Sequence, residues 1–82
     1  MTARMEERME IVLHQMSDGD WYRVAEIGMR SWTNQYRLRM FYLAHTEGFI
    51  ERREQPGTKP GFKTVTYRIT EKGLRWIREK AA

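Results

Sequence analysis

The fold is decided where a helix passes into a strand, in the stretch Leu43-Ala44-His45-Thr46-Glu47-Gly48-Phe49-Ile50-Glu51-Arg52-Arg53. Gly48 suits the left-handed backbone conformation that commonly ends a helix, because glycine has no Cβ to clash there. The apolar pair Phe49 and Ile50, followed by charged residues, predicts that a short strand begins at once. The stretch therefore predicts a helix that runs directly into the first arm of a hairpin.

The helix before Gly48 is predicted to span about residues 32–47. Ser31 and Thr33 can cap its start, and no glycine or proline interrupts it. A helical wheel groups its core-facing residues as Tyr36, Met40, Leu43 and Ala44, with Phe41 beside them. The opposite face, predicted to meet water, carries Gln35, Arg39, Tyr42 and Thr46.

The hairpin is predicted over about residues 49–69. Residues 54–61 contain two Pro-Gly pairs, which exclude regular structure and indicate an exposed loop tip. The returning strand alternates apolar with polar residues, Val65, Tyr67 and Ile69 with Thr64, Thr66 and Arg68. This period of two predicts a strand with one buried face.

A first helix is predicted over about residues 4–17. Its apolar face recurs at helical spacing and consists of Met5, Met9, Val12, Leu13 and Met16. A polar turn at residues 17–20 ends it, and residues 21–24 favour a short strand against the hairpin.

Two more helices complete the predicted order. Residues 24–30 are interpreted as a short second helix with Ile27 inward, although Gly28 lowers its helix propensity. Thr70 can cap a last helix over about residues 70–80.

The junction at residues 43–53 resembles the end of the recognition helix and the start of the wing in MarR-like and PadR-like transcription factors. There a leucine, a charged turn, a glycine, two apolar residues and basic residues follow one another. The stretch Tyr67-Arg68-Ile69-Thr70-Glu71-Lys72-Gly73 is similar to the closing strand and helix start of these families. The resemblance implies one α+β domain over residues 1–82: a winged helix-turn-helix with a three-helix core, a β-hairpin wing and a C-terminal helix.

The resemblance further implies a small transcriptional regulator that binds double-stranded DNA, with this helix in the major groove and the wing on the backbone or minor groove. Amide side chains pair with adenine edges, guanidinium groups bond guanine or phosphate, and hydroxyls at a helix start suit phosphate. The residues of these types in and before the helix are Ser31, Thr33, Asn34, Gln35, Arg37 and Arg39.

The register of the DNA-facing side has two alternatives, one residue apart. Leu43 lies five residues before Gly48, whereas relatives place this leucine four before, and Ala44 occupies that slot. We therefore favour Gln35 and Arg39 over their neighbours as base-reading residues. Trp32 either packs beneath the turn or lies against DNA sugars, and packing is preferred.

Basic residues are predicted to make the wing positive: Arg52, Arg53, Lys59, Lys63 and Arg68, with Lys59 at the tip. The chain as a whole has fifteen Lys and Arg against eleven Asp and Glu, a net charge of +4. This balance favours a polyanion, either nucleic acid or an anionic membrane surface, but it also suits plain solubility. Sheet edges likewise carry lysine to block aggregation.

Alternative functions stay open. A winged helix can act as a protein-interaction or assembly module without sequence-specific DNA binding, because a fold does not fix a function. A single-strand or RNA binder ranks last, since the aromatic residues are scattered over different elements. A homodimer is expected, with candidate contacts on the first and last helices at Met5, Met9, Trp76 and Ile77.

Enzymatic chemistry is not expected. The chain has no cysteine, no P-loop, no dinucleotide-binding turn and no His-Glu-x-x-His pair, and its two histidines, His14 and His45, are predicted on different helices. No cofactor, metal or small-molecule ligand is expected. The charged start and the absence of a long apolar run predict neither a secretory signal nor a membrane span, hence a cytoplasmic location, nucleoid-associated when bound to DNA.

Overall fold

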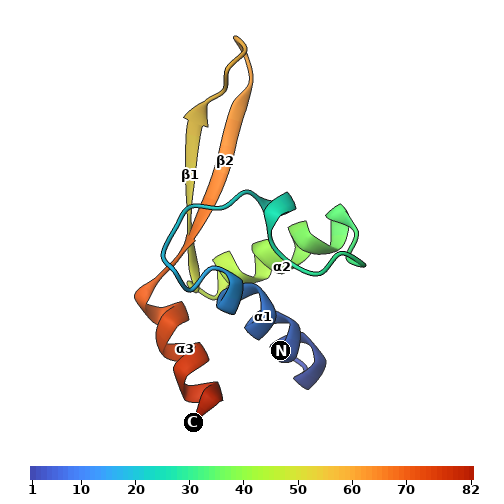
Figure 1. Ribbon diagram of the computed structural model, residues 1–82, viewed down its shortest axis with the longest axis vertical. Helices are drawn as coiled ribbons and strands as arrows, with labels where there is room; N and C mark the ends of the chain where they lie inside the picture. Colours follow the sequence, from blue (N-terminus) through green and yellow to red (C-terminus); the bar gives the residue numbers. More distant parts are fainter.

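The computed structural model describes residues 1–82 as an α+β domain with three α-helices and one two-stranded antiparallel sheet. In chain order the elements are α1 (Ala3–Gln15), the 3-10 turn η1 (Val24–Glu26), α2 (Asn34–Thr46), β1 (Ile50–Pro56), β2 (Lys63–Ile69) and α3 (Glu71–Ala81). Figure 1 shows the helices gathered at one end, with the β1–β2 hairpin projecting from them as a narrow arm. The molecule is therefore elongated, 46 Å along its longest axis and 20 Å along its shortest.

The core lies where the helices meet the base of the hairpin. From α1 and the residue that follows it, Met9, Val12, Leu13 and Met16 are fully buried, because their spacing places them on one helical face. Met5 shares this face but is only partly buried. The other buried apolar residues are Ile27, Met40, Phe41, Ala44, Phe49, Ile50, Ile69 and Ile77. Every helix and both strands therefore contribute to one core.

The predicted caps set the helix ends. Thr33 Oγ1 accepts the N–H of Tyr36 at 3.1 Å, and Thr70 Oγ1 accepts the N–H of Gly73 at 3.2 Å. Gly48 follows α2 with a φ of +77°, which confirms the predicted left-handed helix end. The predicted spans of the first, third and last helices differ from the structure by at most two residues at any end.

The second predicted helix, at residues 24–30, is wrong beyond its first turn. Only Val24–Glu26 is helical, as a single 3-10 turn, and Ile27 is already extended with a ψ of 151°. Gly28 then takes a φ of +102°, which no right-handed helix allows. Ile27 is nevertheless buried, as predicted. The segment therefore keeps its inward contact as a loop rather than as a helix.

The short strand predicted at residues 21–24 is reduced to one β-bridge. Tyr22 pairs with Tyr67 of β2, and each residue's N–H donates to the other's carbonyl at 2.8 Å. The chain before η1 is thus fastened to the hairpin at a single point.

The hairpin is confirmed, with Ile50 opposite Ile69 at its base and Pro56 opposite Lys63 near its tip. Its predicted burial pattern is wrong at Thr66, which was expected to face water but is buried. The face of Thr66 also carries Arg53 and Arg68, whose guanidinium groups lie over the Trp21 ring at 4.1 and 4.6 Å. The segment that begins at Trp21 therefore covers the Thr66 face of the hairpin, which the alternation of apolar and polar residues in β2 assigns to solvent.

The residues expected at a dimer contact belong largely to the core. Met9 and Ile77 are 0% and 5% exposed, because α1 and α3 pack against each other. The Trp76 ring lies 5.0 Å from that of Phe49. These side chains hold the last helix onto its own domain and offer little free apolar surface.

Candidate nucleic-acid interface

The loop before α2 is held by side chains from both neighbouring helices. Gln15, the last residue of α1, accepts the N–H of Gly28 at 2.7 Å and donates to its carbonyl at 3.3 Å. From α2, Arg37 Nε donates to the Ile27 carbonyl at 2.9 Å, and a second Arg37 nitrogen donates to the Met29 carbonyl at 2.8 Å. These bonds fix the entry into α2 without any regular helix before it.

Arg37 and Asn34, both expected among the DNA-contacting residues, contact the protein itself in the structure. Arg37 is partly buried and turned back onto the loop, and its remaining nitrogen donates to Asn34 Oδ1 at 3.2 Å. An arginine that satisfies two carbonyls and a neighbouring amide has a structural role. The two residues are therefore occupied by the protein itself, which leaves the favoured register with Gln35 and Arg39 outward.

The outward face of α2 carries polar and apolar residues together. Gln35 and Arg39 are both exposed, as predicted, and Arg39 forms no hydrogen bond or ion pair with the rest of the chain. A shallow hollow beside them is lined by Thr33, Gln35, Tyr36 and Arg39. Tyr42 is 74% exposed on the same face. This is the one helical face of the domain that presents a free arginine beside a free amide side chain.

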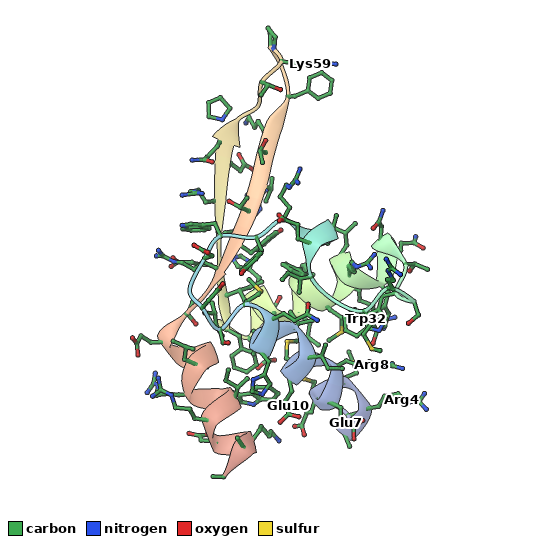
Figure 2. The ribbon with its side chains drawn as sticks, in the orientation of Figure 1. Arg4, Glu7, Arg8, Glu10, Trp32 and Lys59 are labelled. Carbon is green, nitrogen blue, oxygen red and sulfur yellow. The ribbon has the colours of Figure 1, made fainter.

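Some residues at the start of α2 make contacts within the domain, and others are exposed. Ser31 and Thr33 are exposed, but the hydroxyl of Thr33 is already used as the helix cap. Trp32 packs edge-on against Tyr36 with 5.0 Å between ring centres, which supports the packing interpretation. Figure 2 shows Arg8 of α1 close to Trp32, and both line a second shallow hollow at this end of the helix.

Three of the basic residues of the hairpin stem form ion pairs with the two glutamates of β1, which the sequence prediction of a positive wing did not include. Arg52 and Lys63 both approach Glu54, at 2.6 and 3.6 Å. The hydrogen bond from Arg52 lowers the pKa of Glu54 and raises that of Arg52 itself. Arg68 Nε donates to Glu51 at 2.8 Å. Arg53 lies over the Trp21 ring and has no carboxylate partner, so the stem keeps a net positive charge although each of its cations contacts another side chain.

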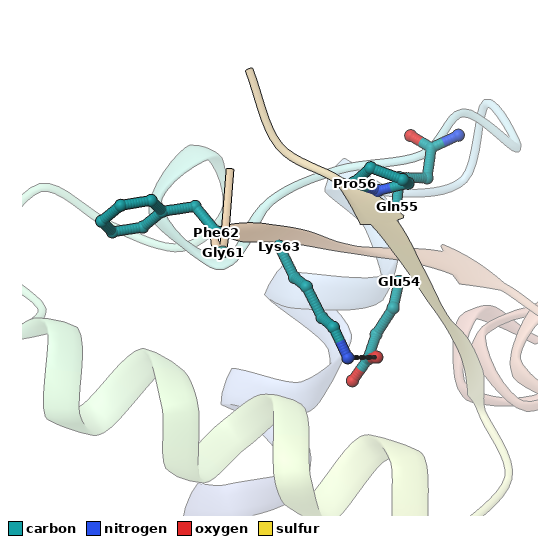
Figure 3. Close-up of a pocket in the computed structure, with 6 residues that line it drawn as sticks. All are labelled: Glu54, Gln55, Pro56, Gly61, Phe62 and Lys63. Atoms are coloured by element: carbon teal, nitrogen blue, oxygen red, sulfur yellow. Dashed lines mark ion pairs between the residues drawn. The ribbon is translucent and has the colours of Figure 1, made fainter. Parts of the chain in front are cut away.

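The hairpin tip differs from its stem. Lys59 is exposed and forms no ion pair, and Figure 2 shows it at the far end of the arm. Phe62, also at the tip, is 68% exposed. Sequence reasoning missed Phe62, although an aromatic residue between a Pro-Gly turn and a lysine was a visible signal. Figure 3 shows its ring projecting away from Pro56 and Gln55, with which it lines a shallow hollow.

No three His, Cys, Asp or Glu residues come together in a way that could hold a metal ion, and none of the helices has the length and apolar character needed to cross a bilayer. No protein-family model matches the chain, and the searches found neither a curated protein nor a solved structure that is significantly similar to it.

Proposed function

We propose that the chain is a winged helix-turn-helix domain that binds double-stranded DNA as a small transcriptional regulator, with α2 in the major groove and the hairpin as a wing on the backbone or minor groove. The observation that carries this proposal is the pairing of Gln35 with Arg39 on the exposed side of α2. Both side chains are exposed, and Arg39 takes no part in the ion pairs that the chain forms.

The spacing of these two residues suits base recognition. Residues four apart on a helix are separated by about 6 Å along its axis, since each residue rises about 1.5 Å. Successive base pairs lie about 3.4 Å apart, so the two side chains can reach base pairs about two steps apart. Gln35 has the donor and acceptor that match an adenine edge, and Arg39 has the fork that matches guanine.

The charge distribution supports a polyanionic partner. The chain has a net charge of +4, and its unpaired cations include Arg39 on α2 and Lys59 at the wing tip. Phosphate contacts from such groups release counterions, so binding weakens as salt rises.

The test is selection of bound sequences from a random double-stranded pool, followed by anisotropy titration of the selected duplex at several salt concentrations. Arg39→Ala is expected to weaken binding to that duplex by about 1–3 kcal/mol and to relax its preference at one base pair. Arg78→Ala removes the same charge from an exposed position on α3 and serves as the matched control, with little expected change. Absence of duplex binding at low salt, or binding that salt does not alter, would contradict the proposal.

One observation favours a protein-interaction module as a second candidate. Leu38 and Tyr42 are 55% and 74% exposed on α2, and such apolar surface is common where one protein meets another. For such a module, Leu38→Ala would abolish capture of a protein partner, while Arg39→Ala would not change any affinity for duplex DNA. For a DNA-binding domain, Arg39→Ala is expected to weaken duplex binding.

We include a homodimer in the proposal, because one small domain on DNA buries limited surface and binds weakly. Two copies on a near-palindromic site would place their α2 helices about 34 Å apart. Analytical ultracentrifugation with the selected duplex measures this directly. A one-to-one complex on a site without internal symmetry would restrict the proposal to a monomer.

A further inference from the structure

The tip of the β1–β2 hairpin presents an aromatic ring that the domain does not use in its own core. Phe62 is 68% exposed, although burial of a phenyl ring is among the largest contributions a side chain makes to stability. Its backbone is nevertheless held in place. The Phe62 carbonyl accepts the N–H of Gly57 at 2.7 Å, and its own N–H donates to the Lys59 carbonyl at 3.2 Å. A hydrogen-bonded turn therefore points the ring outward.

The charges around the ring indicate what it meets. Lys59 lies in the same turn without an ion pair, Lys63 follows Phe62 directly, and residues 55–70 contain no acidic side chain. The nearest carboxylate, that of Glu54, is shared between Arg52 and Lys63. The hairpin tip thus presents an exposed apolar ring with positively charged side chains beside it. A DNA minor groove offers the complement, namely a negative potential and stacked bases between which an apolar side chain can enter.

The arm has the length that this contact requires. Each strand of the hairpin has seven residues, which span about 23 Å at about 3.3 Å per residue. With α2 in the major groove, the next minor groove lies about half a helical turn away, or roughly 17 Å along the duplex. Figure 1 shows the arm extending well beyond the helices.

We propose that Phe62 is a wedge that enters the minor groove between two base pairs and bends the duplex. This inference rests on the proposed DNA-binding function and adds to it a separate contact, by a residue that reads deformability instead of a base edge. Lys59 holds the adjacent phosphates, and the ring unstacks one base step. The preferred wing target is therefore a flexible pyrimidine–purine step, which opens most readily.

The experiment uses the full chain and the selected duplex, labelled at its two ends with a donor and an acceptor dye. Wild-type protein is expected to raise energy transfer by bringing the ends together. Phe62→Ala is expected to bind about tenfold more weakly and to leave transfer at the level of the free duplex. Phe62→Leu, which keeps an apolar wedge, is expected to retain most of the bend. The salt dependence of binding should be the same in all three, because no charge changes.

The possible outcomes separate the two proposals. Bending by Phe62→Ala equal to that of wild type, or wild-type binding without any bend, overturns the wedge and leaves the role of α2 intact. Failure of the wild type to bind any duplex overturns both. A parallel binding assay uses vesicles of anionic phospholipid. If wild type binds them and Phe62→Ala does not, while the two bind and bend duplex equally, the ring belongs to a membrane contact and the wedge is overturned.

Discussion

The side-chain amide of Gln15 forms a pair of hydrogen bonds with the backbone of Gly28, accepting its N–H at 2.7 Å and donating to its carbonyl at 3.3 Å. This pair ties the end of α1 to the loop that enters α2. Gln15→Ala is expected to lower the free energy of unfolding by about 1 kcal/mol, since both bonds are lost at an exposed site. Urea unfolding followed by tryptophan fluorescence measures the change. Gln15→Glu keeps only the hydrogen-bond acceptor, so its free energy of unfolding should lie between those of wild type and Gln15→Ala. An unchanged urea midpoint for Gln15→Ala would contradict the proposed role of Gln15 in holding the loop.

Arg37 is expected to matter for folding and Arg39 for DNA binding, although they lie two residues apart. Arg37→Ala should cost about 2 kcal/mol of unfolding free energy, because it frees the carbonyls of Ile27 and Met29. Arg37→Lys should recover little, since an ammonium lacks the planar fork that serves both carbonyls. Arg39→Ala is the matched control and should change stability by less than about 0.5 kcal/mol. Equal destabilisation by both alanine variants would disprove the distinction.

Gly73 permits α3 to lie close to the chain before β1. A Cβ at this position would meet the Phe49 carbonyl oxygen at 2.4 Å. Helix propensity alone predicts that Gly73→Ala stabilises the protein by about 1 kcal/mol. We expect the opposite sign, a loss of about 2 kcal/mol or more, because the neighbour is backbone and cannot move away freely. Thermal unfolding decides between the two signs.

The contact between Tyr22 and Asp18 is expected to show in a tyrosine titration. The hydrogen bond to the Asp18 carboxylate raises the pKa of Tyr22 from 10.0 to about 12. Because the folded value is the higher one, the stabilisation is complete below pH 10 and disappears as pH rises through about 12. The pKa of Asp18 is lowered by the same bond, so its stabilisation is present above the ordinary value of 3.8 and is lost in stronger acid.

Ultraviolet absorbance of tyrosinate follows this titration. One of the four tyrosines should ionise well after a group with an ordinary pKa, and Tyr22→Phe should remove that late step. Asp18→Asn should bring the step back toward pH 10. A late step that persists in both variants would assign it to another tyrosine.

Lys59 and Lys63 are expected to contribute differently to the salt dependence of DNA binding. Lys59 is free, so Lys59→Ala should reduce the slope of log affinity against log salt by about one. Lys63 lies 3.6 Å from Glu54, so its removal should reduce the slope by less. Anisotropy titrations on one duplex at several salt concentrations give both slopes. Equal effects would mean that the ion pair to Glu54 does not survive in the complex.

The features that sequence predicted correctly are those that local chemistry determines. Thr33 and Gly48 bracket α2 because each supplies what a helix end needs within a few residues. The hairpin follows from two Pro-Gly pairs between two short strands. The outward position of Gln35 and Arg39 follows from helical periodicity, which requires no knowledge of the neighbours.

The features that sequence could not predict depend on contacts between distant residues. Residues 24–30 have a pattern that fits a helix, and the loop is held instead by Gln15 and Arg37, which belong to other elements. The basic residues of the hairpin look equivalent in the sequence. Which of them is free depends on register, since Glu51 lies directly opposite Arg68. Only the folded chain separates a cation that is already paired from one that is available.

The bridge between Tyr22 and Tyr67 has a consequence for the proposed DNA complex. It clamps the segment before η1 to the middle of the sheet, while Arg37 clamps the segment after η1 to α2. α2 and the β1–β2 hairpin are thereby connected through the short segment that contains η1. In the proposed complex this connection fixes the distance along the duplex between the base pairs that α2 contacts and the base step that the hairpin tip contacts. Inserting a single base pair between them should weaken binding more than altering the sequence in between.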